Sequence, residues 1–390
     1  MFKVYNYVSD LEAYLSNLIT EKTTRVVWLG VNRMFPNYYR IILRLGINDI
    51  SIMDNNPAKH GRVYYPLGLE EQDEYKIECG PLQILETDKD RTLFLMQNSH
   101  HDELSDQLSQ YGISRDRIID LSGFFPKWRE GRAEQDLKGF RQVDGRELQL
   151  RELQILKDFA RFCDTHELRY YMAEGTLIGA VRHGGFIPWD DDIDVFMPYD
   201  DYMKLLSIYH DDGKYELLDW RKTKNYPYQF AKFSDSETRL VHPEENGFVI
   251  MGICIDVFPL TGYPSDREEI KKKWDRNIAL DAVIYPYRFF LGADGYEMED
   301  CRQQVNDEKY AMSFSESDMI STAQLIRFAP WATRRAAFDN SIKLKFEDGE
   351  FNAPAGYDEY LKDRYGDYMT LPPKEERHMH FYPSYIRDDE

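Results

Sequence analysis

Residues 190–198 constrain the fold more than any other stretch, because a cluster of acids runs there directly into an apolar strand. Alternate residues of a strand share a face, so Asp192 and Asp194 project together, and Asp190 joins them if the strand begins that early. Carboxylates held this close repel one another unless a cation lies between them. Mg²⁺ binds through one or two carboxylates together with phosphate oxygens. The pattern therefore predicts metal-assisted chemistry on a phosphate, with Asp190 and Asp191 as second-choice ligands.

The acids of the central region also have plainer, structural interpretations. A short acidic run is more often a solvated loop or an incidental Ca²⁺ site. The apolar residues 195–197 oppose that interpretation here, since they carry the run into a core strand. A further acid, Asp256, stands alone within the apolar segment 253–260. A lone buried carboxylate is costly unless it is paired or coordinates a metal, so Asp256 is either another site carboxylate or the partner of an arginine.

Small and cationic residues around the acidic run are candidate phosphate contacts. Gly175 and Thr176 open a predicted helix, and the amides at the N-terminus of a helix favour a phosphate. Lys232 interrupts the apolar pattern of residues 230–233, which distinguishes it from an ordinary surface lysine. The remaining cationic candidates are Arg182, His183 and Arg377. Each of the four, taken singly, is also compatible with a purely structural role.

Two adjoining stretches, 175–183 and 185–194, carry a resemblance to a known family. They closely resemble the LicD family of phosphotransferases, which includes phosphocholine transferases and the fukutin-related proteins. The family's Ile-Asp-[Ile/Val]-Phe-Pro-Leu element is matched at 255–260, and its closing segment at 351–373, which Arg377, His378 and His380 follow. The resemblance spans about 145–383 and implies a nucleotidyltransferase-like fold.

This resemblance also implies an activity. A phospho-alcohol group, such as phosphocholine, passes from a CDP-activated donor to a sugar hydroxyl of a cell-surface glycan or its precursor, and CMP is released. Asp192, Asp194 and Asp256 would be the catalytic carboxylates and hold Mg²⁺ or Mn²⁺, with Asp256 binding a second ion or taking the acceptor's proton. Two alternatives stay open: a nucleotidyltransferase that makes an NDP-activated compound from an NTP, and a catalytically silent glycan-binding or scaffold protein.

The N-terminal part of the chain lies outside this resemblance and has a pattern of its own. Residues 1–24 predict an amphipathic helix, after which short apolar strands alternate with helices up to about residue 121. Such alternation predicts a parallel α/β sheet, here a Rossmann-like domain over 1–122. The dinucleotide-binding glycine motif is degenerate, because only Gly30 is kept ahead of Asp54. We therefore expect a scaffold or oligomerisation role rather than cofactor binding.

At 390 residues the chain is long enough for a second domain. We expect a connector over 123–146 and an α+β catalytic domain over 147–390, with a helical insertion at 265–335. An aromatic cluster at 285–290 lies within that insertion. It is either ordinary core, part of an acceptor pocket, or a contact with a membrane surface.

The composition of the chain limits which partners and which cellular location are expected. A net charge of −20 opposes broad binding to nucleic acid, and four scattered cysteines indicate neither a disulfide framework nor a zinc site. The N-terminus lacks a signal-peptide core, and no run approaches the ~18 apolar residues of a membrane span, which predicts a cytoplasmic protein. The expected partners are a CDP-alcohol donor and a glycan or lipid-linked glycan acceptor. Peripheral contact with the inner membrane face and a homo-oligomer stay open.

Overall fold

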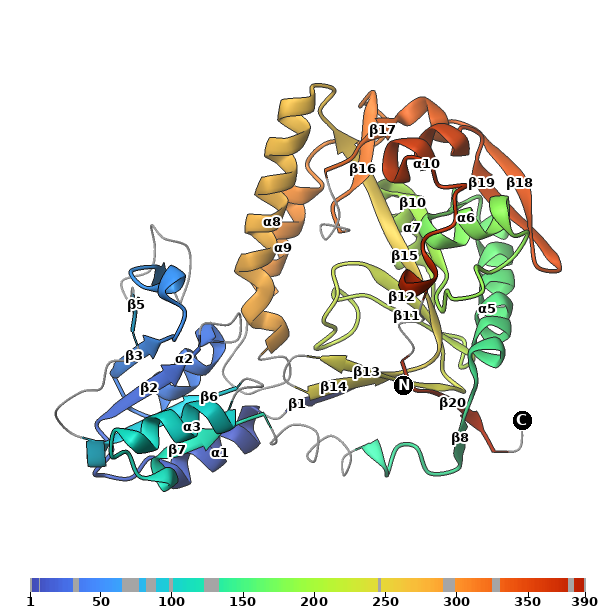
Figure 1. Cartoon of the computed structure of the whole chain (residues 1–390). Helices are drawn as coiled ribbons and strands as arrows, with labels where there is room; N and C mark the ends of the chain where they lie inside the picture. Colours follow the sequence, from blue (N-terminus) through green and yellow to red (C-terminus); the bar gives the residue numbers. More distant parts are fainter. Residues whose placement is uncertain are drawn as a thin grey trace.

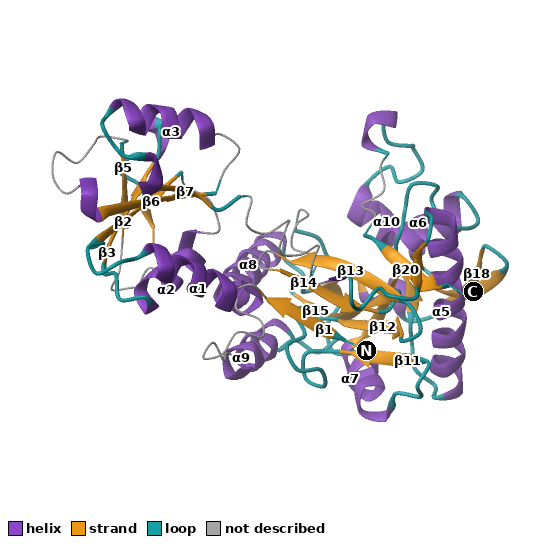
Figure 2. Cartoon of the chain, turned by 90° about the horizontal axis from the view of Figure 1, so that it is seen from below, coloured by secondary structure: helices purple, strands orange, loops and turns teal. Residues whose placement is uncertain are grey.

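The computed structural model describes most of the 390-residue chain. The described residues are 2–6, 8–30, 35–64, 77–81, 89–97, 101–122, 133–244, 247–289, 299–324, 330–377 and 382–388. They form an N-terminal α/β unit beside a larger body that holds the rest of the chain, and both views show the two as separate masses (Figures 1 and 2). Within the described residues, no helix is both long and apolar enough to cross a membrane.

A six-stranded sheet, ordered β4-β5-β3-β2-β6-β7, forms the N-terminal unit. Its strands are β2 (Arg25–Leu29), β3 (Asp49–Met53), β4 (Val63–Tyr64), β5 (Ile77–Gly80), β6 (Thr92–Met96) and β7 (Ile118–Asp120). All neighbours pair in parallel except β4 with β5. Residues of α1 (Val8–Leu18) and α2 (Phe35–Arg44) pack in one apolar cluster with the sheet, and residues of α3 (His101–Gln110) in another. The parallel α/β sheet predicted from the alternating pattern is confirmed.

The first strand of the chain belongs to a different sheet. β1 (Lys3–Asn6) pairs antiparallel with β14 (Gly247–Met251), and the Tyr5 ring stacks on Phe248 with centroids 4.7 Å apart. The predicted helix over 1–24 is therefore wrong at its start, because the helix begins only at Val8. Residues 3–6, which the boundary at 1–122 assigns to the N-terminal unit, pair with the larger body instead. The reason is physical: Phe2, Val4 and Tyr5 carry apolar or aromatic side chains, which pack against apolar clusters of the larger body.

The five-stranded sheet that contains β1 has the order β1-β14-β13-β20-β8. Its other strands are β8 (Phe140–Gln142), β13 (Arg239–Glu244) and β20 (Ser384–Arg387). β8 lies within the segment predicted as a connector, and it pairs with β20 near the end of the chain. The two ends of the larger body are thus joined in one sheet.

A seven-stranded sheet forms the centre of the larger body. Its path is β11-β12-β15-β10-β9, with β16 paired to β15 and β17 paired to β16. The bounds are β9 (Tyr171–Met172), β10 (Asp194–Pro198), β11 (Tyr215–Leu218), β12 (Ala231–Asp235), β15 (Cys254–Tyr263), β16 (Met319–Thr322) and β17 (Thr333–Arg334). Its residues share one large apolar core with α5 (Gly145–Thr165), α6 (Glu174–Arg182) and α7 (Tyr199–Ile208).

The segment predicted as a helical insertion is only partly helical. α8 (Arg267–Phe289) and α9 (Glu299–Lys309) are helical as predicted, and they lie against each other (Figure 1). Residues 319–322 and 333–334 are strands instead, because they extend the central sheet through β15. The predicted role of the aromatic cluster at 285–290 falls on side chains outside the described set.

The C-terminal part adds a hairpin and a helix. The hairpin is β18 (Ser341–Phe346) with β19 (Gly349–Pro354), and the helix is α10 (Tyr357–Tyr365). Single turns of 3₁₀-helix complete the described elements: η1 (Pro57–Lys59), η2 (Lys89–Arg91), η3 (Arg115–Arg117), η4 (Arg335–Phe338) and η5 (Lys374–Glu376).

Candidate active site

The two acid-bearing strands lie side by side in the central sheet. β10 begins at Asp194 and pairs in parallel with β15, so that Asp194 is the ladder partner of Asp256. The amide of Asp256 donates a hydrogen bond of 2.8 Å to the carbonyl of Ile193. Ile193 and Val195 are completely buried on either side of Asp194, which is itself only partly buried. The pairing therefore brings together two of the three predicted carboxylates from segments far apart in the sequence.

The acidic run ends immediately before β10. Asp190, Asp191 and Asp192 each place a carboxylate oxygen within 4.8 Å of the others. A hydrogen bond of 2.8 Å from the Gln149 side chain to the Asp190 carbonyl holds the run against α5. On its other side, a Cβ atom added to Gly175 would lie 2.4 Å from Asp190 Oδ2. A side chain at position 175 would therefore displace the Asp190 carboxylate.

Burial, and after it mutual repulsion, set the electrostatics of these acids. Desolvation and the charges of Asp192 and Asp191 raise the pKa of Asp190 to about 8. Desolvation and the charge of Asp256 raise the pKa of Asp192 to about 6, although its side chain is solvent-exposed. The pKa of Asp194 is raised well above its usual range by desolvation, Asp192 and Asp256. Oxygen donors that repel one another in this way suit a hard divalent cation, whose charge removes the repulsion.

Lys232 is paired with Asp256. The two are ladder partners on β12 and β15, and Nζ lies 2.5 Å from Asp256 Oδ1. Burial opposes the ammonium charge, but the neighbouring carboxylate outweighs this effect and raises the pKa of Lys232. The ammonium also lies 5.1 Å and 5.3 Å from the ring centroids of Tyr228 and Phe230. The structure thus combines both interpretations of Asp256, since it lies beside Asp194 and also pairs with a cation, a lysine rather than an arginine.

The N-terminus of α6 is held by residues that sequence reasoning missed. The helix begins at Glu174, which has a positive φ of 44°. Its carboxylate accepts hydrogen bonds from Tyr360 Oη (2.8 Å), Arg364 Nε (3.1 Å) and Tyr365 Oη, all on α10. Thr176 is buried, and its Oγ1 accepts a hydrogen bond of 2.8 Å from the Asp194 amide. Thr176 therefore supports the start of β10.

The remaining cationic candidates gather around Trp189, the residue before the acidic run. Arg377 places its guanidinium 4.9 Å from the Trp189 ring centroid, and His183 makes an edge contact with the same ring at 6.1 Å. Arg182 donates a hydrogen bond of 2.6 Å to the Tyr368 carbonyl. Burial and the charge of Arg377 lower the pKa of Arg182. His378 and His380 lie outside the described residues.

Comparison with known proteins finds a family match in the segment that holds the acidic strand β10. Residues 167–294 match the family described as "LicD/FKTN/FKRP, nucleotidyltransferase domain". The chain carries a LicD domain. Over 264 residues it is 29% identical to a Haemophilus influenzae protein named lipopolysaccharide cholinephosphotransferase LicD, in an alignment covering 60% of this chain and 95% of that protein. A Rickettsia prowazekii protein, named only as uncharacterized, is 30% identical over 169 residues, 42% of this chain and 57% of that protein. The predicted family and enzyme class, a LicD-type transferase, are confirmed.

Parts of the site come from outside the residues that match the LicD domain. α5 precedes the match and supplies Gln149, and α10 follows it and supplies the partners of Glu174. Arg377 also lies beyond the match, yet it contacts Trp189 within it. The LicD domain is therefore completed by flanking elements on both sides in the sequence.

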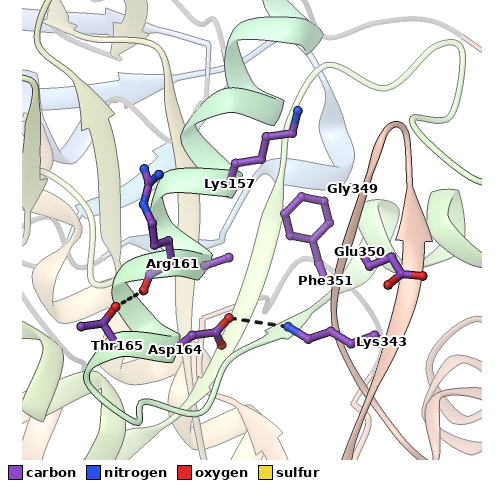
Figure 3. A pocket seen from close by; sticks show the side chains of 9 residues that line it. Lys157, Arg161, Asp164, Thr165, Lys343, Gly349, Glu350 and Phe351 are labelled. Atoms are coloured by element: carbon purple, nitrogen blue, oxygen red, sulfur yellow. Dashed lines mark hydrogen bonds and ion pairs between the residues drawn. The ribbon is translucent and has the colours of Figure 1, made fainter.

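A surface hollow of about 500 Å³ lies elsewhere, between α5 and the β18–β19 hairpin (Figure 3). None of the predicted site residues lines it. Its charged groups have partners of their own, among them Lys157 with Asp348 (2.7 Å) and Lys343 with Asp164 (3.7 Å). The hollow is therefore separate from the predicted site residues.

Proposed function

We propose that this chain transfers a phospho-alcohol group, phosphocholine or a close analogue, from a CDP-activated donor to a sugar hydroxyl of a glycan or lipid-linked glycan. The reaction releases CMP and requires Mg²⁺ or Mn²⁺. The observation that carries the proposal is the parallel pairing of β10 with β15, which puts Asp194 opposite Asp256 directly after the acidic run. The similarity to a lipopolysaccharide cholinephosphotransferase supports the choice of donor and acceptor.

The residues of the acidic strands would bind the cation. Asp192 and Asp194, with Asp190 and Asp191 beside them, are the ligands we propose, and their raised pKa values fit a site that a divalent ion neutralises. When bound, the ion neutralises charge on the diphosphate and on the group in transfer. Asp256 would then be either a ligand of a second ion or the base of the reaction.

The other residues of the site would orient the substrates. Arg182 and Arg377 are neighbouring cations beside the acidic run, and we assign them to the diphosphate. The acceptor hydroxyl oxygen forms a bond to the phosphorus that carries the alcohol, while the bond from that phosphorus to the bridging oxygen breaks and CMP leaves. If Asp256 is the base, the hydroxyl proton passes to its carboxylate, which Lys232 holds in place through their ion pair.

For the N-terminal unit we propose a scaffold role on a Rossmann-like fold. Counted along the chain without β4, its parallel strands have the order 3-2-1-4-5, which is that of a doubly wound sheet. Asp54, at the end of β3, is engaged within its own turn: its carboxylate pairs with Lys59 at 2.8 Å, and its carbonyl contacts His60 at 2.7 Å. This engagement favours a structural role for the acid over binding of a ribose.

The decisive experiment incubates the full chain with CDP-choline, an acceptor glycan and Mg²⁺, and measures CMP and phosphocholine-bearing glycan. CDP-ethanolamine, CDP-ribitol and CDP-glycerol serve as alternative donors. Asp192→Asn and Asp194→Asn should fold and lose turnover by about 10²-fold or more, the scale on which a lost electrostatic stabiliser acts. Asp200→Asn, on an exposed residue of α7, is the matched control and should keep full activity.

The products separate the proposal from its alternatives. Pyrophosphate released from an NTP, without CMP release from any CDP-alcohol, would instead make the protein a nucleotidyltransferase. Wild-type turnover in Asp192→Asn or Asp194→Asn would refute the assignment of these carboxylates. Binding of glycan without turnover of any of these donors would favour the silent binding protein.

A further inference from the structure

A sixth acid, Glu152 on α5, lies close to the acidic strands, and no part of the proposed mechanism uses it. Glu152 is only 2% exposed, and its Oε2 atom has no hydrogen-bond partner among the residues that the structure describes. Burial raises the pKa of Glu152 well above its usual range, and the charges of Asp192, Asp191 and Asp190 add to the shift. A buried polar atom without a partner is rare in folded proteins and costs free energy. Its position next to the acidic run therefore needs an explanation.

The helix is held at this place by several independent contacts. One turn before Glu152, Gln149 donates to the Asp190 carbonyl (2.8 Å), so the two residues share a face of α5 directed at the acidic run. Arg146 in turn donates to the Gln149 side chain at 3.1 Å. Asp144 and Glu147 form a capping box that fixes the start of the helix. Glu152 is thus presented to the acids by a well-anchored element and not by a mobile side chain at the surface.

A charged carboxylate in this position costs free energy unless a cation is present. It lies near carboxylates whose pKa values are already raised by mutual repulsion. The neighbouring ammonium of Lys232 is engaged by Asp256 at 2.5 Å. A divalent cation at the acidic run would supply positive charge to the whole group and give the Glu152 oxygen a polar partner, either directly or through water.

We propose that Glu152 is a further carboxylate of the divalent-cation site, supplied by α5 from outside the LicD match. The inference rests on the proposed function, because it assumes that the acidic run binds a divalent ion. It extends the site from two strands of the central sheet to a helix that precedes them. It also gives α5 a part in activity. Glu152 would contribute to the cation site, and the Gln149 side-chain amide holds the Asp190–Asp192 segment through the Asp190 carbonyl.

The test measures binding of Mn²⁺ to the full chain by the electron paramagnetic resonance signal of the free ion. Glu152→Gln keeps the shape of the side chain and should raise the Kd for Mn²⁺ by about 10- to 100-fold, as expected for a lost outer carboxylate of a metal site. Asp164→Asn is the matched control and should bind Mn²⁺ as the wild type does. It removes one charge from the same helix about 18 Å further along, at the exposed end that pairs with Lys343 (Figure 3).

Thermal unfolding provides a second readout that a merely structural role would not produce. Without metal, Glu152→Gln should melt no lower than the wild type, because it removes an acid from a group of repelling acids. With saturating Mg²⁺, the increase in melting temperature should be smaller in Glu152→Gln than in the wild type. Glu152→Met, of similar volume, repeats both measurements if the glutamine variant does not fold.

The possible results separate this inference from the proposed function. If the wild type binds Mn²⁺, Asp192→Asn does not, and Glu152→Gln binds as tightly as the wild type, the role of Glu152 is refuted and the proposed function stands. If the wild type binds neither Mn²⁺ nor Mg²⁺, the cation dependence of the proposed function is refuted, and this inference with it.

Discussion

Replacing Arg364 by methionine should destabilise the LicD domain strongly. The side chains of Arg364 and Glu174 are only 2% and 6% exposed, and they form an ion pair of 3.1 Å between α10 and the first residue of α6. Removing one member of a buried pair leaves an uncompensated charge and typically costs 3–5 kcal/mol. Because Tyr360 and Tyr365 still donate to the Glu174 carboxylate, we expect about 3 kcal/mol.

A double-mutant cycle tests the origin of this loss. Glu174→Gln in the Arg364→Met background removes the stranded charge and keeps an oxygen that accepts from Tyr360. The double variant should therefore recover about 2 kcal/mol relative to Arg364→Met alone. Urea unfolding followed by tryptophan fluorescence is a suitable assay, because the Trp331 ring centroid lies 5.4 Å from the Arg364 guanidinium carbon. A single variant within about 1 kcal/mol of the wild type, or strictly additive effects, would show that the pair does not hold α6 to α10.

Two further predictions follow from close packing and from burial. Gly175→Ala should lower turnover and Mn²⁺ affinity while changing the free energy of unfolding little. Its methyl group would lie 2.4 Å from the Asp190 carboxylate and displace it. Unchanged Mn²⁺ binding would contradict this prediction. Lys273→Met should stabilise the protein at pH 7 by about 1 kcal/mol, since burial lowers the pKa of this half-buried lysine to about 8 and so penalises its charged form. The penalty is fully present below pH 8 and fades as the pH rises towards the ordinary lysine pKa of about 10.5. Urea unfolding should therefore show that the stability gained in Lys273→Met shrinks between these two pH values. A gain that is constant with pH would contradict the prediction.

The acidic strand could be found in the sequence because its signal is local. Adjacent acids followed by alternating apolar residues specify a strand with one charged face, and the lone acid at 256 stands out in an apolar run. The parallel N-terminal sheet was equally accessible, since short apolar segments alternate there with helical ones. The first strand, β1, could not be predicted from the sequence, because four residues next to a longer helical pattern carry too little signal. Only their pairing with β14 decides their structure.

What the sequence by itself determined is which residues are acidic, which of them fall on strands, and to which family the central segment belongs. Only the tertiary structure decided that Asp194 lies opposite Asp256, that Lys232 neutralises Asp256, and that Glu152 is buried. On α5 the apolar positions alone predict a face that packs on the core. From the sequence, Glu152 would be expected beside that face and exposed to solvent. Its burial follows from how the helix packs on the sheet, which depends on contacts between distant segments that no local pattern encodes.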